Sequence, residues 1–250
     1  MQLVVLADPP REGMVLPSLA ETSPLTEADA AACYEAMLKD AIVTGDRSGA
    51  DLLVNYRPDD LLPDGSSGDA SAGDAVRSIV ADTLGSTEGV RIEPQVGSTK
   101  SARVGNTVTH LLREEDHSSV VVLSPTAPFV ARTTIDNAAM KLRRSPVVLG
   151  PAGGGRAYYR GFTELVDFED AFEPPELLTV TRRADEADLD VDFLEMMPLV
   201  ETGDDLTTAV AMLRARVQAG RIVPGHFAEF VADRGLDVAV EDGAARVVRV

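Results

Sequence analysis

The chain has 250 residues, of which 44% are hydrophobic, and its 41 acidic and 23 basic residues give a formal net charge of −18. This hydrophobic content suits one large domain, or one domain with an extension, and excludes a wholly disordered chain. The acidic balance, without any basic patch, argues against nucleic acid or an anionic membrane as the main partner.

The first 150 residues alternate short apolar runs with amphipathic segments. We expect strands at 3–6, 51–56, 90–95, 120–123 and 147–149, one helix from Thr26 onward, and further helices at 74–84, 101–115 and 132–142. Thr26, with Asp29 three residues later, predicts a capping box at the start of its helix. The uninterrupted apolar run at 120–123 indicates a strand that is buried on both faces.

This alternation is typical of a Rossmann-like α/β fold, in which helices flank a mostly parallel sheet. Right-handed crossovers bring the loops that follow the strands to one edge of the sheet. Ligands of open α/β sheets bind beyond these carboxyl ends. The loops after Leu6, Leu123 and Leu149 are therefore the expected walls of a site.

Two parts of the chain depart from the alternation. The segment 58–73 is rich in Pro, Gly, Ser and Asp and predicts a mobile loop. Beyond residue 174 we expect helices at 175–187, 204–219 and 226–234, a strand at 189–196, and a hairpin of 238–241 and 246–250. Asp242-Gly243 between the hairpin strands is a type I′ turn signal. We expect a main domain over 1–220 and a helix–hairpin extension over 221–250.

The helix at 204–219 should have one inward face, formed by Leu206, Val210, Leu213 and Val217. The exposed edge of the closing hairpin, at 246–250, predicts that a second copy of the chain can pair with it.

Lysine contributes only Lys39, Lys100 and Lys141 to the basic residues. An acidic, lysine-poor surface is typical of proteins in concentrated salt, where a Debye length of roughly 3 Å at 1 M screens self-repulsion. A GC-rich genome would also favour arginine over lysine, but it does not explain the excess of acid. We therefore expect a halophilic protein.

Cys33 is the only cysteine, so neither an intramolecular disulfide nor a cysteine zinc site can form, and we expect it to be a small core residue. The start of the sequence lacks the basic region of a signal peptide, and no run reaches the ~20 apolar residues of a membrane span. We expect a cytoplasmic protein with no integral membrane part.

Several segments, taken in chain order, match the sequence pattern of one protein family. They are the opening strand with Ala7, Pro10 and Gly13, the pair Gln95 and Arg103, the run 120–130 with Pro128, the stretch 147–162, and Glu201-Thr202 before Asp204-Asp205-Leu206. In this order they resemble the glycosyltransferase-A-like proteins of bacteria and archaea, a branch of the nucleotide-diphospho-sugar transferase superfamily, over roughly residues 1–215. The resemblance implies a glycosyltransferase-A type fold, a nucleotide-sugar ligand, and Mg²⁺ or Mn²⁺ bridging its diphosphate.

The chain departs from this family where the family carries charge. The first loop normally presents Lys-Thr-Arg to the nucleotide phosphates, whereas Leu16, Pro17 and Ser18 stand here. Thr126 replaces the carboxylate of the second loop, and Gly154 replaces the aspartate of the third. Leucine, threonine and glycine neither neutralise phosphate nor hold a hard divalent cation.

Candidate contacts to a nucleotide or sugar come from the three loops. They are Ala7, Asp8 and Gly13, then Ser124 and Thr126, and finally Gly153, Gly154, Gly155 and Arg156. The glycine amides allow close approach of a phosphate, and Arg156 is the natural cation beside them. A glycine-rich stretch after a strand is equally typical of an ordinary turn, and no Gly-Lys-Ser/Thr of a P-loop follows.

Other polar residues give weaker signals. Asp188, Asp190 and Asp192 resemble a metal-binding DxD motif on one face of a strand, a pattern that is also typical of a solvated edge in an acidic protein. The three histidines are too far apart in sequence to form a metal-binding pair. Tyr158 and Tyr159 can stack on a base or sugar, or pack at the edge of the domain.

These features leave three hypotheses for function. The first is a nucleotide-sugar-dependent glycosyltransferase, in which Asp8, Asp136 or Glu201 replaces the missing acids. The second is a nucleotidyltransferase, such as a guanylyltransferase, on the same fold. The third is a non-catalytic relative that binds a small-molecule ligand or a partner.

Overall fold

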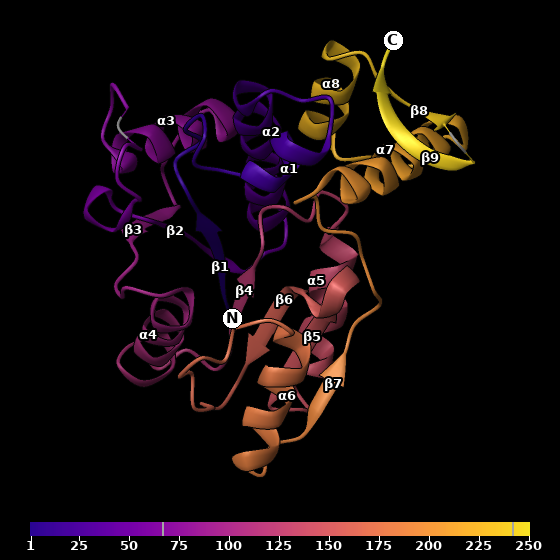
Figure 1. Cartoon of the computed structure of the whole chain (residues 1–250). Helices are drawn as coiled ribbons and strands as arrows, with labels where there is room; N and C mark the ends of the chain where they lie inside the picture. The colour runs from indigo at the N-terminus through magenta and orange to yellow at the C-terminus, as the bar shows by residue number, and fades with distance from the viewer. Residues whose placement is uncertain (67, 242) are drawn as a thin grey trace.

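The fold centres on a seven-stranded sheet of order β3-β2-β1-β4-β6-β5-β7 (Figure 1). A computed structural model of the chain describes residues 1–66, 68–241 and 243–250, without the side chain of Glu241. The sheet strands are β1 (Gln2–Ala7), β2 (Asp51–Tyr56), β3 (Arg91–Pro94), β4 (Val120–Leu123), β5 (Val147–Pro151), β6 (Ala157–Phe162) and β7 (Val191–Phe193). This is the mostly parallel α/β sheet that the sequence predicts.

Strand β6 is the exception to the parallel arrangement. It pairs antiparallel with β4 on one side and β5 on the other, so it enters the sheet at the edge where the other strands end. All six of its residues are buried. No strand is expected here from the sequence, where Arg160 and Gly161 interrupt the apolar pattern.

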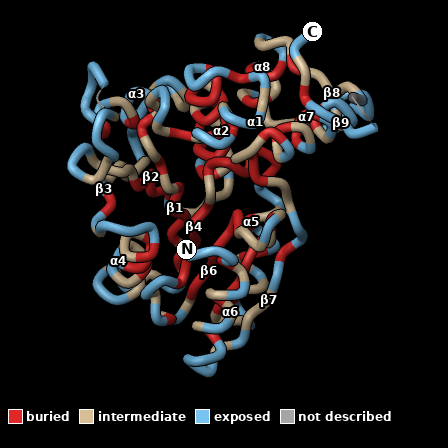
Figure 2. The backbone as a smooth tube through the Cα atoms, viewed as in Figure 1, coloured by how far each residue is buried: buried red, intermediate tan, exposed pale blue. Residues whose placement is uncertain are grey.

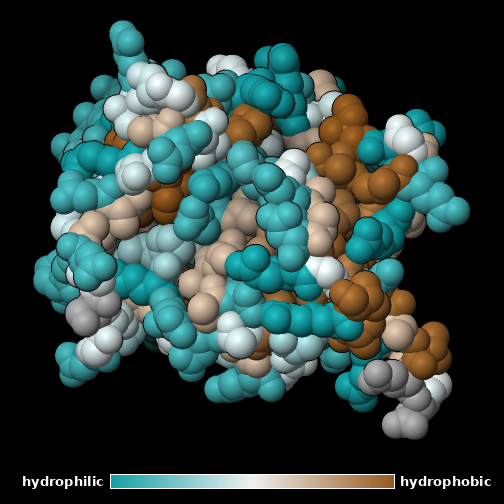
Figure 3. Space-filling view, turned by 90° about the horizontal axis from the view of Figure 1, so that it is seen from above, coloured by the Kyte–Doolittle hydropathy of each residue, from teal (hydrophilic) through white to brown (hydrophobic). Residues whose placement is uncertain are grey.

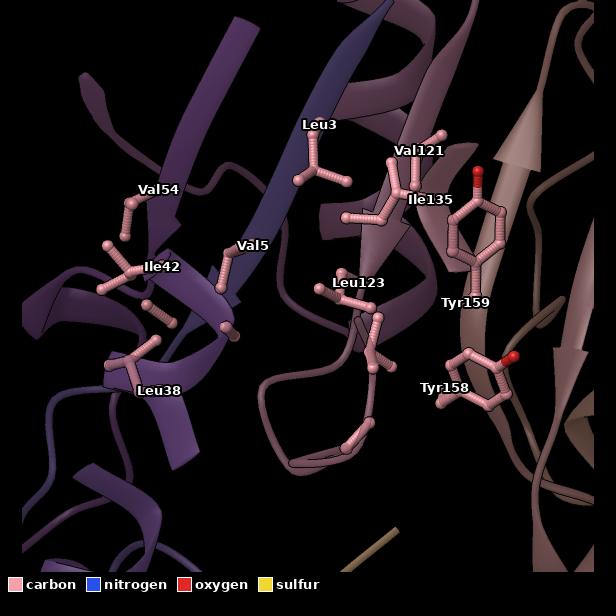
Figure 4. Packing of buried hydrophobic residues seen from close by; sticks show 14 of the residues in the cluster. Leu3, Val5, Leu38, Ile42, Val54, Val121, Leu123, Ile135, Tyr158 and Tyr159 are labelled. Atoms are coloured by element: carbon pink, nitrogen blue, oxygen red, sulfur yellow. The ribbon is translucent and has the colours of Figure 1, made fainter. Parts of the chain in front are cut away.

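Helices cover both faces of the sheet, and the core lies in two layers (Figure 2). On one face pack α2 (Glu27–Asp46), α3 (Ala72–Leu84) and α5 (Arg132–Lys141). On the other face pack α4 (Lys100–Arg113) and α6 (Glu176–Glu186). The strands supply aliphatic side chains to both layers, as Leu3 and Val5 do to the first and Val4 to the second. Figure 4 shows the first layer, where Leu38 and Ile42 of α2 lie against Val5 and Val54.

Helix α2 begins after Thr26, as predicted, and a capping box stabilises its first turn. The Thr26 hydroxyl accepts a hydrogen bond from the Asp29 backbone N–H at 3.1 Å, and the Asp29 carboxylate accepts one from the Thr26 N–H at 3.2 Å. This reciprocal pair satisfies two backbone donors that have no partner within the helix. The capping box at Thr26 is therefore confirmed.

A third cluster of buried residues joins the C-terminal elements to α2. It includes α1 (Pro17–Thr22), α7 (Gly203–Gln218), α8 (Gly225–Asp233) and the hairpin of β8 (Leu236–Glu241) and β9 (Ala244–Arg249). Cys33 lies in this cluster, fully buried, as a small core residue. The Asp29 carboxylate also accepts hydrogen bonds from Arg234 and Arg249, which tie the end of the chain to the start of α2.

Three details differ from the sequence predictions. Helix α1 was not expected, and the strand expected at 189–196 is reduced to the three residues of β7. Val217, expected to face inward from α7, is 56% exposed because it lies in the last turn, beyond the surface that the rest of the helix covers. Asp242 of the predicted type I′ turn lies outside the described residues, and the division at residue 220 stays a prediction.

The segment 58–73 is anchored at several points. It contains a short 3₁₀ turn at Asp59–Leu61, and its last two residues already belong to α3. The Arg11 guanidinium donates to the backbone oxygens of Ser66 and Ala70 and to the Asp59 carboxylate, at 2.5, 3.0 and 2.8 Å. Ser67 lies outside the described residues, and the mobility of this loop stays a prediction.

None of the described helices has the length and apolar character needed to cross a lipid bilayer. Seen from above, the surface is mostly hydrophilic, and hydrophobic residues gather on the side of the C-terminal elements (Figure 3). The exposed hydrophobic residues there are Val217, Ile222, Val240 and Val250.

Candidate functional site

A pocket of about 340 Å³ lies beyond the carboxyl ends of β1 and β4. This is the edge at which ligands of open α/β sheets bind, because loops of several strands converge there. The pocket is lined by residues of the first loop and α1 (Ala7, Asp8, Met14 to Ser18), of the loop after β4 (Ser124 to Thr126), of α4 (Lys100, Arg103, Val104), and by Leu6, Tyr34, Gln95, Arg160 and Glu201.

The predicted contact residues divide into two groups. Ala7, Asp8, Ser124 and Thr126 line the pocket. Gly13, the glycine turn 153–155 and Arg156 are not among its lining residues. The loops after β1 and β4 therefore meet at the pocket, and the loop after β5 reaches it only through a partner of Arg156.

The part of the first loop that leads into α1 gives the pocket an uncharged wall. Leu16, Pro17 and Ser18, which stand where the resembling family has Lys-Thr-Arg, all line the pocket. Leu16 holds a left-handed backbone, with φ at 53°, at the residue that precedes α1. A bulky side chain rarely adopts this conformation, so the first loop carries local strain beside the pocket.

Helix α4 supplies two positively charged side chains to the pocket instead. Lys100 and Arg103 lie one helical turn apart in its first residues, and both line the pocket. The Arg103 Nε donates to Gln95 Oε1 at 2.8 Å, and the Gln95 amide in turn donates to the Asn55 carbonyl at 2.7 Å. The weakest segment of the sequence resemblance, Gln95 with Arg103, thus forms one continuous network in the wall of the pocket.

Asp8 lines the same pocket as these α4 cations. Its backbone N–H donates to the Tyr34 hydroxyl at 2.8 Å, which fixes the exit of β1 against α2. Among the described residues, no side chain donates a hydrogen bond to the Asp8 carboxylate. Burial raises the pKa of Asp8 above its ordinary value, although Arg57 and Arg103 attract the charged form and oppose the shift.

Arg160, which lines the pocket, belongs to a buried ion pair. Arg160 of β6 is 2% exposed and donates through Nε and Nη2 to the carboxylate of Glu176 at the start of α6. The Lys100 ammonium lies 3.5 Å from the same carboxylate. Burial alone would raise the pKa of Glu176, but Arg160 and Lys100 hold it below its ordinary value. Two cations therefore share one carboxylate here.

Arg156 is held by acidic side chains of the segment that precedes and begins α7. Its Nη1 donates to Glu201 Oε2 and Asp205 Oδ2, both at 2.9 Å, and its Nη2 donates to Asp205 Oδ1 at 2.7 Å. Glu201 lines the pocket and accepts a further bond from the Thr126 hydroxyl at 3.2 Å. Arg156 thus connects the loop after β5 with the loop after β4, and two carboxylates neutralise its charge.

The glycine turn is packed against its own chain. The Arg156 Nε folds back onto the Gly153 carbonyl at 2.7 Å, and Gly154 and Gly155 have positive φ values of 69° and 73°. A side chain at Gly150 would meet Tyr158 at 2.6 Å, so this glycine is required by the packing of β6. Tyr158 and Tyr159 are fully buried in the core, which supports the packing interpretation of both.

The aspartates of the suspected DxD motif do not share one face of a strand. Asp188 and Asp190 precede β7, Asp188 with a φ of 56°, and only Asp192 lies in the strand, where Lys141 binds it at 2.7 Å. Because β7 runs parallel to β5, its start lies at the edge of the sheet opposite the pocket. The predicted arrangement is wrong because the strand is shorter than its alternating sequence indicates.

Other acids give no further metal candidate. Asp136 lies on α5 in an exposed pair with Arg132 and does not line the pocket. Within the described parts of the chain, no three or more His, Cys, Asp and Glu side chains are grouped so as to hold a metal ion.

Lys100, Arg160 and Glu176 are pocket or ion-pair residues that no sequence pattern singled out. Arg160 is visible in the sequence only as an isolated charge beside Tyr158 and Tyr159. Such an arginine indicates a buried charge that needs a partner, but its partner Glu176 lies 16 residues away in a different element.

Neither a protein-family model nor a curated protein matches the sequence. Among solved structures, the chain is similar to a protein of Desulfovibrio desulfuricans whose name places it among the nucleotide-diphospho-sugar transferases, with a TM-score of 0.74 and 18% identity over 93% of this chain and 94% of that one. It is also similar to 4-diphosphocytidyl-2C-methyl-D-erythritol synthase from Anaerococcus prevotii, with a TM-score of 0.51 and 13% identity over 86% and 96% of the two chains. The chain therefore has the fold of the nucleotide-diphospho-sugar transferases, as its sequence resemblance implies.

Proposed function

We propose that the pocket binds a nucleotide sugar and that the chain is a glycosyltransferase. The observation that carries this proposal is a pocket with three cations, Lys100, Arg103 and Arg160, in a chain whose net charge is −18. Cations gathered in a concave site attract anionic ligands and raise their local concentration. The pocket lies where this fold class binds its ligands, and the name of the Desulfovibrio desulfuricans protein gives the same class of transferase.

The chemistry of such a site is positioning and charge stabilisation. The bond between the anomeric carbon and the diphosphate breaks, and its electron pair leaves with the nucleoside diphosphate. An acceptor hydroxyl forms the new bond and loses its proton. Fixed cations beside the departing diphosphate stabilise the charge that develops on it.

Asp8 is the residue that we assign to take the acceptor's proton. It lines the pocket, and no described side chain donates a hydrogen bond to its carboxylate. Its raised pKa makes it a stronger base than an ordinary aspartate. Glu201, the other pocket carboxylate that the sequence suggests, is engaged by Arg156 and Thr126.

The first experiment is calorimetric titration of UDP-, GDP-, CDP- and dTDP-sugars in molar KCl. We expect one of them to bind, and a ligand present at 100 times its dissociation constant should stabilise the fold by about 2.7 kcal/mol. Asp8→Asn should retain this binding and lose transfer. If the folded chain binds no member of the panel, the proposal is wrong.

A nucleotidyltransferase is the second candidate. The three pocket cations, Lys100, Arg103 and Arg160, also suit the longer chain of a nucleoside triphosphate. The two reactions differ in their products: nucleotidyl transfer releases pyrophosphate, whereas glycosyl transfer releases a nucleoside diphosphate. Binding without either product would favour the non-catalytic hypothesis.

A further inference from the structure

The divalent metal that the family resemblance implies does not fit the donors around this pocket. A protein site for Mg²⁺ or Mn²⁺ beside a diphosphate usually supplies one or two carboxylates that are free to approach the ion. Here Arg156 pairs with Glu201 and Asp205, and Arg160 and Lys100 pair with Glu176. Asp8 is the pocket carboxylate without an ion pair among the described residues, and the positive charges of Arg57 and Arg103 act on it. A divalent cation would have to displace a paired arginine or lysine, or bind to Asp8 against the repulsion of Arg57 and Arg103.

The same wall has an unbalanced positive charge. Lys100 and Arg160 share the single carboxylate of Glu176. Arg160 is 98% buried, since only 2% of it is exposed, and its Nη1 has no hydrogen-bond partner among the described residues. An unpaired donor on a buried charge is costly, so an anion that approaches this wall would be stabilised.

Helix α4 adds to this positive field. Lys100 is its first residue, and Arg103 follows one turn later on the side that lines the pocket. The amino end of a helix carries a partial positive charge that favours anions. Burial and the adjacent Arg160 lower the pKa of Lys100, and a bound anion would counter both effects.

We propose that Lys100, supported by Arg160 and the amino end of α4, takes the place of the divalent metal and binds the diphosphate of the ligand directly. This inference rests on the proposed function and goes further, because it makes binding of the nucleotide sugar independent of metal. The charge that the family places in its first loop and in a metal ion lies here on α4 and β6.

Lys100→Met tests the inference, because methionine keeps most of the length of the side chain and removes its charge. With UDP, GDP, CDP and dTDP as probes in EDTA and fixed molar KCl, we expect at least tenfold weaker binding of the cognate diphosphate by Lys100→Met. Lys100→Arg should restore most of the affinity. Lys39→Met, at a lysine of α2 that pairs with Glu35 and does not line the pocket, is the matched control and should bind as the wild type does.

Manganese supplies a readout that does not depend on activity. We expect Mn²⁺ to change the affinity of the wild type less than twofold, and the paramagnetic resonance signal of free Mn²⁺ to show no protein-bound ion beyond what the nucleotide alone binds. Binding that strengthens tenfold or more with Mn²⁺, or equal binding by wild type and Lys100→Met, would overturn the inference while the proposed function stands. Absence of binding to every probe, with and without Mn²⁺, would overturn both.

Discussion

At the scale of single residues, the pocket depends on a buried charge that one carboxylate keeps in place. Arg160 and Glu176 are 2% and 5% exposed. A buried pair of this kind adds little stability compared with well-packed apolar residues, but removal of one partner leaves an uncompensated charge. The pair therefore matters more for the shape and charge of the pocket than for the overall stability of the fold.

Glu176→Gln should destabilise the chain by about 3–5 kcal/mol, because it leaves the Arg160 guanidinium buried without a counter-ion. The free energy of unfolding in urea measures the effect. Glu173→Gln, three residues earlier at an exposed position, is the control and should unfold like the wild type. A loss below about 1 kcal/mol, the usual value of an exposed pair, would mean that water reaches Arg160.

Glu115 should give the stability of the fold a dependence on pH. Hydrogen bonds from Arg91 lower the pKa of this carboxyl to about 2, and His110 and His117 lie 3.1 and 3.4 Å from it. Since the pKa is depressed in the folded state, the stabilisation is complete above the ordinary value near 4.5 and is lost as the pH falls toward 2.

The measurement compares the free energy of unfolding of wild type and Glu115→Gln at pH 5.5 and pH 3. The wild type should be the more stable at pH 5.5, and the difference should shrink at pH 3. Glu114→Gln, an exposed neighbour, should show no such convergence. A difference that is constant with pH would show that Arg91 does not stabilise the ionised carboxylate.

At the scale of elements, α8 has its cap supplied from the first part of the chain. Pro224 precedes the helix and offers no side-chain hydrogen bond. The Asp40 carboxylate of α2 accepts instead from the backbone N–H groups of His226 and Phe227, at 3.1 and 2.8 Å. The start of α8 is thus held to α2 by side-chain capping across 186 residues of sequence.

Asp40→Ala should cost about 1–2 kcal/mol, as loss of a helix cap does. Amide hydrogen exchange should accelerate mainly in 225–233, because the first turn of α8 loses its acceptor. Asp46→Ala, at the exposed end of the same helix, should leave that exchange unchanged. Uniform acceleration over the whole chain would instead indicate global destabilisation.

The elements were largely predictable from the sequence, whereas the charged part of the site was not. The capping box at Thr26 and the apolar strands depend on residues that are close in sequence, so their patterns predict the local structure. Lys100, Arg160 and Glu176 come from three elements, and only the fold brings their charges together. Strand β6 escaped prediction because Arg160, buried through this ion pair, interrupts its apolar run.

At the scale of the whole molecule, the excess of acid should make stability dependent on salt. With a net charge of −18, like charges on the surface repel one another, and salt shortens the range of that repulsion. The midpoint of thermal unfolding should rise between 0.1 and 2 M KCl. Sucrose at equal osmolality is the control, because it stabilises proteins through its exclusion from their surface and does not screen charge. An equal rise of the unfolding midpoint in sucrose would contradict an electrostatic cause.

The C-terminal hairpin gives a prediction about assembly. Strands β8 and β9 form a separate two-stranded sheet, and Val240 and Val250 are 76% and 86% exposed. An open edge with exposed apolar side chains favours pairing with another strand. Light scattering after gel filtration in molar KCl should find a dimer, and Val240→Lys, which puts a charge at an exposed apolar position of the hairpin, should reduce it. A wild type that elutes only as a monomer contradicts this prediction.

The hydrogen bonds between Asp29 and the C-terminal elements join residues that are synthesised at well separated times. Arg234 and Arg249 lie 205 and 220 residues after the carboxylate that they bind. At the usual 5–20 residues per second, a ribosome needs roughly 10–40 s to make that length. During this interval the face of α2 that later meets Phe227 and Phe230 has no partner from the end of the chain. This face of α2 thus stays uncovered until the elements that contain Arg234 and Arg249 have been made.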